Sequence, residues 1–369
     1  MHVALVSFWF AEYCVLQANA LAEHARVSLL FPTETLGDQR SRLSPRVEHI
    51  DVPHHGRWSP GYLMTIPRLA RLIRRLNPDV IHTHSAGHSR LMLAMPLLRR
   101  FPLLLTVHDP TFHPGEEASR LSAWAHRLGR RRADHFTLHS ESLCQTFHEV
   151  WGIDRERMTI LAHGLLDYSH RHDPDLVPPA RGHALLFGRL QAYKGIPVLI
   201  EAAARLRSAP PEFKIVIAGR GDDMTANRAR IAELDLEDRI IFLERHIDEP
   251  LVDALHRHAR VVVLPYLEAS QSGPATTACA YGKPLIASRV GALPDIVREG
   301  ETGLLVPPGD PDALAGALDR IATDDALAAR LAEGSRRFGE THLSWDVLAP
   351  RHLEACERAI AARRRALGH

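Results

Sequence analysis

The segments PRLARLIRRL (residues 67–76) and DVIHTH (79–84) are close neighbours and show the unit from which this chain is built. Four apolar residues recur at helical spacing in the first segment: Leu69, Leu72, Ile73 and Leu76. The second segment is short and carries Val80 and Ile81 on consecutive positions, as a strand does. Similar runs, such as LLLTVHD (103–109), carry Val or Leu on consecutive positions, which is typical of strands covered by helices on both faces. This alternation predicts an α/β fold with a parallel sheet.

The alternation continues in both directions and forms two series of strands. Seven strands are predicted in the first series, at 3–8, 27–31, 47–52, 79–84, 103–109, 135–140 and 158–164. Six are predicted in the second, at 184–190, 214–219, 240–246, 261–266, 284–288 and 302–307. A polar stretch with three prolines separates the two series at 169–182. We therefore expect one doubly wound domain over 1–168, a linker over 169–182 and a second doubly wound domain over 183–344. A last helix, over 345–369, can pack back on the first domain or on the second.

Composition excludes several classes of protein. The 369 residues include 45 Lys and Arg and 44 Asp and Glu, so the formal charge is +1, and 45% of the residues are hydrophobic. These values are typical of a globular protein and not of a disordered chain or a fibre. The small net charge argues against nucleic acid as a partner, because phosphate binding needs a basic excess. The 24 histidines are an unusual store of titratable groups.

The cysteines and the N-terminus indicate the compartment. Four cysteines stand far apart without a CxxC pair, which fits reduced core residues and not a disulfide scaffold. The N-terminal run MHVALVSFWF has neither a basic lead nor a small-residue cleavage site, so a first strand is expected there and not a signal peptide. No run approaches the roughly 20 apolar residues of a membrane-spanning helix. We expect a cytoplasmic protein.

The segment FGRLQAYKG (187–195) is the first candidate site. Arg189 leaves a predicted strand and Lys194 precedes a predicted helix, with Gly188 and Gly195 beside them. Two cations together with amides at a helix N-terminus can hold a diphosphate. The alternative is that both cations are ordinary surface charges.

The segment PYLEASQSGPATTACAYGKP (265–284) is the second candidate site. A helix is predicted to begin near Gly273, because the proline that follows is well placed in a first helical turn. Ser270, Gln271 and Ser272 precede that turn and form a pocket rich in donors and acceptors, which suits an anion or a polyhydroxyl ring. The alternative is a helix cap with a satisfied loop.

The run from ALLFGRLQAYKG through GKPLIASRVGALPDIVREGETGLLVPPGD resembles the C-terminal domain of the GT4 family of retaining glycosyltransferases. The resemblance implies the GT-B fold, in which two Rossmann-like domains face each other across a cleft. Arg189 and Lys194 fall on the family's donor-diphosphate Arg and Lys, and His108 falls on its cleft histidine. Three further residues at or after the ends of predicted strands are assigned to the donor side: Gly219, Arg220 and His246.

The chain departs from the family at two places. Most members carry two glutamates eight positions apart, where this chain has Ala269 and Thr277; Glu268 and Thr276 stand one place earlier. The sequence here resembles a subgroup with a Ser-Gln-Ser-Gly loop. In the absence of the two glutamates, Thr276, Thr277 or a water would contact the ribose, and Glu268 or backbone amides would contact the sugar. The loop after the first strand lacks the family's Gly-Gly turn.

Four residues are assigned to the acceptor side: Trp9, Phe10, His84 and His163. Trp9 and Phe10 stand in the loop that lacks glycine, where they predict a stacking or apolar surface near the acceptor, or else a filled cleft wall. His82 and His84 point to the same face of a strand, where they line a cleft, satisfy local hydrogen bonds, or ligate a metal with a third partner.

The resemblance implies transfer of a hexose from a UDP- or GDP-linked donor, with retention, to a saccharide or lipid-linked acceptor. No DxD pair stands where a metal would bind, since Asp222 and Asp223 are adjacent, so we expect metal-independent transfer with no cofactor beyond the nucleotide-sugar co-substrate. His108 is then a sugar-positioning or backbone-orienting group. A nucleotide-sugar epimerase and a non-catalytic partner subunit are the alternatives.

Arginine clusters in the first half predict peripheral contact with an anionic membrane, or else a solvated helix face. These clusters are Arg71, Arg74 and Arg75, then Arg99 and Arg100, then Arg130 to Arg132.

Overall fold

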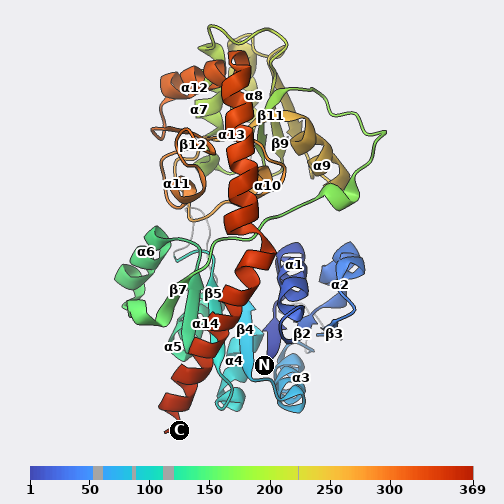
Figure 1. The fold of residues 1–369 in the computed structure, drawn as a ribbon, viewed down its shortest axis with the longest axis vertical. Helices are drawn as coiled ribbons and strands as arrows, with labels where there is room; N and C mark the ends of the chain where they lie inside the picture. The colour runs from blue at the N-terminus through green and yellow to red at the C-terminus, as the bar shows by residue number, and fades with distance from the viewer. Residues whose placement is uncertain (53–60, 85–88, 111–119, 223, 369) are drawn as a thin grey trace. The chain divides into compact units, whose positions relative to one another are not determined.

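The computed structural model describes residues 1–52, 61–84, 89–110, 120–222 and 224–368, and the chain divides into two compact α/β units (Figure 1). Unit 1 comprises Met1–Gly164 and Trp345–His369, and unit 2 comprises Leu165–Ser344. Unit 2 is thus inserted between the two parts of unit 1. All five tryptophans of the chain belong to unit 1.

Unit 1 contains, in its described residues, a seven-stranded parallel sheet of order β3-β2-β1-β4-β5-β6-β7. The order reverses between β1 and β4, which makes their carboxyl ends the topological switch point. The strands are β1 (His2–Val6), β2 (Arg26–Phe31), β3 (Val47–Asp51), β4 (Val80–His84), β5 (Leu103–Val107), β6 (His135–Leu138) and β7 (Met158–Ile160).

Helices cover both faces of this sheet. Helices α3, α4 and α6 pack on one face, and α1 and α14 pack on the other. Helix α14 also contacts α1 and crosses β4, β5 and β6, so the C-terminal helix belongs to unit 1 (Figure 1). The helices are α1 (Ala11–Ala22), α2 (Thr33–Leu36), α3 (Gly61–Leu76), α4 (Ser89–Ala94), α5 (Arg120–Arg132), α6 (Glu141–Trp151) and α14 (Trp345–Ala366).

The alternation of strand side chains sends a row of polar residues under α1 and α14. On β4, Val80 packs in the cluster that contains α14 residues, whereas Ile81 packs in the opposite cluster. Because successive side chains point to opposite faces, His82 and His84 lie on the same side as Val80. Thr106 and Thr137, paired across β5 and β6, continue this row.

Unit 2 contains, in its described residues, a six-stranded parallel sheet of order β10-β9-β8-β11-β12-β13. Its switch point lies between β8 and β11. Helices α7, α8, α12 and α13 pack against one face of this sheet. Helix α9 contacts β8 and β11, α10 contacts β11, and α11 contacts β12. The strands are β8 (His183–Phe187), β9 (Ile215–Gly219), β10 (Ile240–Glu244), β11 (Ala259–Leu264), β12 (Leu285–Ser288) and β13 (Gly303–Val306). The helices are α7 (Ile196–Ala204), α8 (Thr225–Glu233), α9 (Glu249–His258), α10 (Gly273–Ala280), α11 (Leu293–Ile296), α12 (Pro311–Thr323) and α13 (Asp325–Phe338).

The prediction of two doubly wound parallel α/β sheets is confirmed. Several strands end earlier than predicted, because their last polar residues leave the ladder; β5 ends at Val107, before His108. Residues 169–182 are anchored to α9 within unit 2, since Arg171 Nε donates to Glu249 Oε2 at 2.8 Å and His172 Nδ1 lies 2.9 Å from Asp253 Oδ2. Every helix in the described residues is too short or too polar to cross a lipid bilayer.

Candidate functional site

The loops that follow β8 and β11 meet at the switch point of unit 2. Open α/β sheets bind their ligands at such a point, outside the carboxyl ends of the strands. A cavity of about 190 Å³ lies here, and both loops form its walls. Its lining consists of Leu166, Tyr168, Phe187, Gly188, Arg189, Tyr193, Lys194, Gln271, Ser272, Gly273, Pro274 and Thr277.

Lys194 is a buried cation in the wall of this cavity. It is 6% exposed, and its Nζ donates to Tyr266 Oη at 2.5 Å and lies 3.9 Å from the centroid of that ring. Burial, with Arg189 as a smaller cause, lowers the pKa of Lys194 from 10.5 to about 8. No ion pair within the described residues neutralises Lys194. Because a buried charge is costly unless it is paired, an anion in the cavity would supply the missing partner.

Arg189 adds a second cation to the same cavity. It lies just past the end of β8, is exposed to solvent, and has no ion pair within the described part of the chain. A guanidinium presents several donors in a plane and can bind phosphate through two of them. One fixed ammonium and one exposed guanidinium therefore face the cavity together.

The N-terminus of α10 forms the other wall. Ser272 caps the helix, and its Oγ accepts a hydrogen bond from the Ala275 amide at 3.3 Å. Helix N-termini favour anions because their amides and the helix dipole point outward. The Oε1 atom of Gln271 is buried and has no hydrogen-bond partner among the described residues. The serine therefore serves as a cap, and the amide oxygen of Gln271 remains available to a ligand that donates.

The two threonines of α10 are tied to their own helix. Thr276 Oγ1 donates to the Gly273 carbonyl oxygen at 2.9 Å, and Thr277 Oγ1 donates to the same oxygen at 3.1 Å. Thr277 lines the cavity and Thr276 is fully buried outside its lining. Of the two, Thr277 is thus placed to accept a hydrogen bond from a ligand.

The cavity brings together about half of the donor-side residues predicted from the sequence. Those in its lining are Gly188, Arg189, Lys194, Gln271, Ser272, Gly273 and Thr277. Those outside it are Gly219, Arg220, His246, Glu268, Ser270 and Thr276. Arg220 and His246 follow β9 and β10, which lie beyond β8 on the side away from the switch point.

Gly219 contributes to the site through its backbone. Its φ is 152°, and a Cβ there would stand 1.8 Å from the carbonyl oxygen of Gly188. Only glycine permits this approach, so Gly219 lets the loop after β9 close against the loop that carries Arg189.

Sequence reasoning missed the tyrosines around Lys194. Tyr266 is buried at the end of the run 261–266 and accepts the lysine's hydrogen bond, and Tyr193 lines the cavity. Burial raises the pKa of Tyr266, so its hydroxyl stays protonated. A tyrosine at the end of a central strand, just before a site loop, was the available signal.

In unit 1, the predicted acceptor-side residues gather at the carboxyl ends of β4, β5 and β6. His84 Nδ1 lies 3.1 Å from His108 Nε2, and the ring of Phe10 is tilted by 39° to that of His108, with the two centroids 4.9 Å apart. His163 is buried beside them, with its ring centroid 5.3 Å from that of His139. Trp9 is exposed in the same loop as Phe10. His108 Nδ1 lies 3.0 Å from His139 Nε2, so both ring nitrogens of His108 are engaged by other histidines.

Among the described residues, no group of three or more His, Cys, Asp or Glu side chains is arranged to hold a metal. His82 Nε2 is 2.8 Å from Thr106 Oγ1, which accounts for one of its ring nitrogens within the sheet. Asp223 lies outside the described residues.

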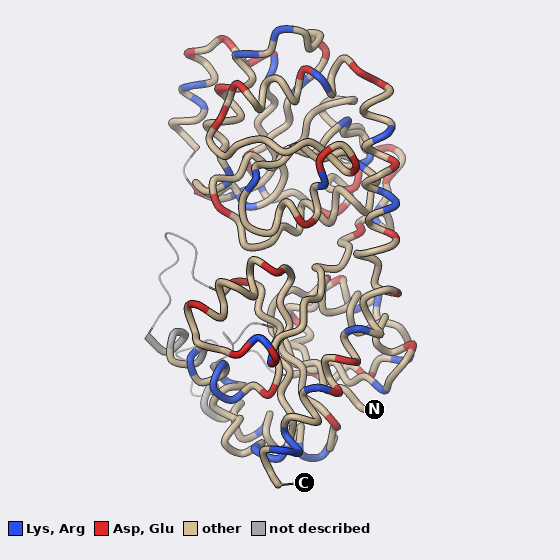
Figure 2. The backbone as a smooth tube through the Cα atoms, turned by 60° about the vertical axis from the view of Figure 1, so that its left-hand side comes forward, with Lys and Arg blue, Asp and Glu red and all other residues tan. Residues whose placement is uncertain are grey.

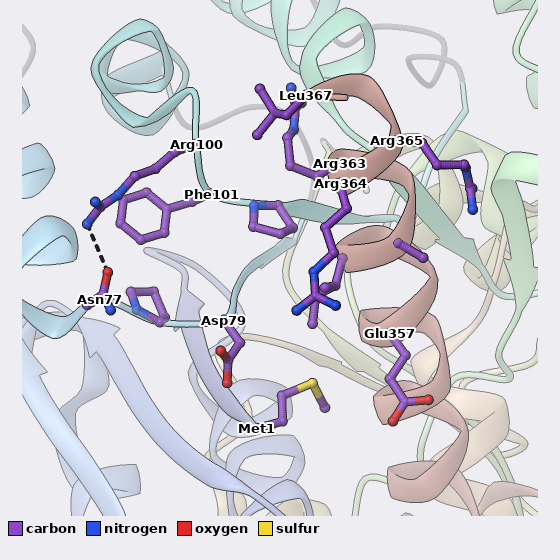
Figure 3. A pocket seen from close by; sticks show the side chains of 14 residues that line it. Met1, Asn77, Asp79, Arg100, Phe101, Glu357, Arg363, Arg364, Arg365 and Leu367 are labelled. Atoms are coloured by element: carbon purple, nitrogen blue, oxygen red, sulfur yellow. Dashed lines mark hydrogen bonds between the residues drawn. The ribbon is translucent and has the colours of Figure 1, made fainter. Parts of the chain in front are cut away.

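A larger hollow, of about 870 Å³, lies at the opposite edge of unit 1, where the amino ends of β4 and β5 meet the end of α14. Basic segments gather along this edge (Figure 2). Figure 3 shows Arg100 donating to Asn77 at 2.8 Å beside the Phe101 ring, with Arg364 across the hollow. Because ligands of α/β sheets bind at the carboxyl ends of the strands, the switch-point cavity of unit 2 is the stronger candidate site.

Comparisons with known proteins match both units. The family described as "Glycosyl transferases group 1" matches residues 181–324, and the family described as "Glycosyl transferase 4-like domain" matches residues 11–164. A D-inositol 3-phosphate glycosyltransferase from Corynebacterium glutamicum is 31% identical over 309 residues, covering 77% of this chain and 73% of that protein.

Two solved structures share the fold. A sucrose-phosphate synthase from Thermosynechococcus elongatus superposes with a TM-score of 0.72 at 23% identity, over 98% of this chain and 100% of that one. Anabaena HepE, solved in complex with UDP-glucose, superposes with a TM-score of 0.75 at 18% identity, over 97% and 99% of the two chains.

Proposed function

The chain belongs to the group 1 glycosyltransferases of the GT4 type, and from this premise we propose that it is a retaining hexosyltransferase that acts without a metal. As a member of this family it transfers a sugar from a nucleotide sugar. The proposed donor is a UDP- or GDP-linked hexose, and the proposed acceptor is a saccharide or a lipid-linked saccharide.

One observation carries the donor site: a buried lysine without an anionic partner faces a cavity at the switch point. We place the donor diphosphate in that cavity, against Lys194 Nζ, the guanidinium of Arg189 and the amides of α10. The site then neutralises the charge that a departing nucleoside diphosphate develops, which is the main electrostatic task of this transfer. Thr277 and Gln271 line the cavity, and we assign them to the hydroxyl groups of the donor.

The proposed reaction needs no acidic side chain at the position of the family's second glutamate. The bond between the anomeric carbon and the diphosphate oxygen breaks, and the electron pair leaves with the nucleoside diphosphate. The acceptor oxygen bonds to the same face of the anomeric carbon. The leaving phosphate oxygen takes the acceptor's proton, so charge and atoms balance. His108 serves as a positioning group and not as the base.

Transfer and hydrolysis measured with a panel of UDP- and GDP-sugars test this function. Arg189→Ala and Lys194→Ala should each lower kcat/KM by roughly ten- to a hundredfold, because each removes a charged hydrogen bond to the diphosphate. Arg207→Ala is the matched control, since Arg207 is an exposed arginine of the same unit outside the cavity lining. Isomerised donor without transfer would favour an epimerase, and binding without turnover would favour a non-catalytic subunit.

For a lipid-linked acceptor, we propose that the basic edge of unit 1 contacts an anionic membrane. Arginines from three helix ends meet there: Arg74 donates to the Leu97 carbonyl, Arg132 to the Phe101 carbonyl and Arg363 to the Arg132 carbonyl. Arg364 and Arg365 follow in the last turn of α14 and have no ion pair within the described residues. Leu97 and Leu367 are exposed beside these arginines.

Arginines in the last turns of helices also complement the helix dipoles, so their presence alone does not require a membrane. Flotation with vesicles containing anionic lipid separates the two roles. Arg364→Gln with Arg365→Gln should reduce salt-sensitive binding, because each arginine near an anionic surface contributes about 1 kcal/mol. Wild-type protein that stays unbound at low salt would overturn the membrane contact and leave the helix-end role.

A further inference from the structure

A cluster of six histidines lies where α1 and α14 cover the sheet in the described part of unit 1, each less than a tenth exposed. Its members are His82, His84, His108, His139, His163 and His352. Three of them are joined ring to ring by hydrogen bonds between nitrogen atoms. At one end of this chain of three rings, the hydrogen-bond partner can only accept, and this determines which nitrogen of each ring carries the proton.

The unambiguous end is the carbonyl oxygen of Leu161. His139 Nδ1 lies 2.9 Å from it, and because a carbonyl oxygen only accepts, Nδ1 carries the hydrogen. In a neutral imidazole the other nitrogen is then an acceptor. His108 Nδ1, 3.0 Å from His139 Nε2, must therefore be the donor of that pair. The carbonyl thus sets the tautomer of His108 through His139.

The same reasoning continues to the far end of the chain. With its hydrogen on Nδ1, His108 accepts at Nε2, so His84 Nδ1, at 3.1 Å, donates. His84 Nε2 is then an acceptor, yet the atom 2.7 Å from it is Oε1 of Gln17, and the amide nitrogen of Gln17 faces His352. Two acceptors cannot share a hydrogen bond, so the amide must turn its NH₂ group toward His84.

The rings are neutral near pH 7. Burial lowers the pKa values of His84 and His108 well below 6.5, and neighbouring histidines lower them further. Burial also lowers the pKa of His139, against a weaker raising effect of the Leu161 carbonyl and of Asp109. His352, which faces Gln17 from α14, is likewise shifted down by burial, with Arg351 nearby. A charged ring is therefore disfavoured along the whole chain.

We propose that His84, His108 and His139 form a one-way chain of imidazoles, each held as its Nδ1–H tautomer between the Leu161 carbonyl and a Gln17 amide that donates. His84 and His139 are then positioning residues for His108. Their hydrogen bonds engage both nitrogens of the His108 ring, and this fixes the orientation of the ring beside Phe10 at the carboxyl end of β5. The effect on sugar transfer rests on the proposed function, whereas the tautomers do not.

Nitrogen NMR of the full chain with ¹⁵N-labelled histidine tests the tautomers directly. Each ring of the chain should show a protonated Nδ1 and an unprotonated Nε2 at pH 7. A protonated Nε2 on His108, or a ring protonated on both nitrogens, would overturn the proposal. This measurement needs no substrate, so its outcome is independent of whether the chain transfers a sugar.

Variants at His139 test the positioning. His139→Phe removes the acceptor of His108 Nδ1–H, and His108 should then populate both tautomers. His139→Gln offers both a donor and an acceptor and should restore the single tautomer. His82→Leu is the matched control, because His82 is equally buried and bonds to Thr106 and not to the chain. If His139→Phe does not fold, the wild-type spectrum still tests the tautomers, and a His139→Gln variant in which His108 populates both tautomers would contradict the positioning.

Activity supplies the second measurement. His139→Phe should lower kcat by on the order of ten- to a hundredfold, because a small misplacement of a positioning group has an effect of that size. The KM for the donor should stay unchanged, since Lys194 and Arg189 lie in the other unit, and His139→Gln should recover most of kcat. An equal loss in His82→Leu would show a merely structural role and overturn the positioning. A wild type without any transfer would refute the proposed function and leave the tautomers standing.

Discussion

Replacement of Lys194 by methionine should separate ligand binding from stability. Lys194→Met keeps an unbranched side chain and removes a charge from a site that is 6% exposed. Below pH 8 the lysine is charged in both the folded and the unfolded chain, and the folded chain carries the full penalty that lowers its pKa from 10.5 to about 8. At 1.36 kcal/mol per tenfold change in proton affinity, this penalty is roughly 3 kcal/mol.

The methionine also loses the hydrogen bond to Tyr266, which is worth about 1.5 kcal/mol for a charged donor. We therefore expect the variant without ligand to be about 1–2 kcal/mol more stable than the wild type at pH 7. The unfolded chain binds more protons than the folded chain between pH 8 and 10.5, so the wild type gains stability as the pH rises through this window. The advantage of the methionine should disappear by about pH 10.

Urea unfolding at pH 7 and pH 10, followed by circular dichroism and tryptophan fluorescence, measures these differences. All tryptophans belong to unit 1, so a change confined to circular dichroism reports unit 2. Lys214→Met is the matched control, because the ammonium of Lys214 donates to the Asp238 carbonyl at the surface; its effect should stay within about 0.5 kcal/mol. A Lys194→Met variant that is less stable than the wild type at pH 7 would refute the reasoning.

The same variant should lose the nucleotide. UDP or GDP raises the melting temperature of a protein that binds it only when folded, and Lys194→Met should weaken that binding by roughly ten- to a hundredfold. Unchanged binding would show that the diphosphate does not contact Lys194.

Three further predictions concern the fold around the two sites. Gly219→Ala should destabilise unit 2 by more than about 2 kcal/mol and abolish nucleotide binding, because the new Cβ would meet the Gly188 carbonyl oxygen. Gly316→Ala, in open space on α12, should instead stabilise the protein by up to about 1 kcal/mol. Calorimetry with both variants measures these changes, and a stable Gly219→Ala would contradict the reasoning. On acidification below pH 6.5, unit 1 should unfold before unit 2. Burial lowers the pKa values of His82 and His163 to about 3, so the unfolded chain takes up protons that the folded unit does not. Tryptophan fluorescence should therefore change first, and an earlier change in tyrosine absorbance of unit 2 would oppose this. Asp134→Ala should cost about 3–5 kcal/mol in urea unfolding, because it leaves Arg132 and Arg363 without their buried carboxylate, and a loss below 1 kcal/mol would contradict that role.

The spacing of the apolar residues predicts the strands of both sheets and which side chains along a strand share one face of the sheet. The sequence places His82 and His84 on one face of β4, and the structure confirms that shared face. The strand order, and with it the switch point, follows from the fold family and not from any single run. The switch point then explains why the loops after β8 and β11 form one cavity.

The environment of each polar side chain could not be predicted. Lys194 has an ordinary surface alternative in the sequence, yet the structure buries it against Tyr266, 72 positions away. His352 is remote from His84 in the chain, and α14 brings it to Gln17. Thr276 and Thr277 are hydroxyl groups in the sequence, but their bonds to the Gly273 carbonyl emerge only once α10 has formed. The contacts of Lys194 and His352 join segments far apart in the sequence, whereas those of the two threonines form only within the folded helix.

Unit 1 is built from two segments that are separate in the sequence, and this has a consequence during protein synthesis. Unit 2 is made between Gly164 and Trp345, so α14 leaves the ribosome only after all of Leu165–Ser344. At 5–20 residues per second this delay lasts roughly 10–40 s. Until then, the face of the sheet that carries Val80 and Leu104 has no α14 to cover it. The apolar side chains on this face of the nascent unit 1 thus stay exposed until α14 is made, and packing of the last helix completes the core of the first half of the protein.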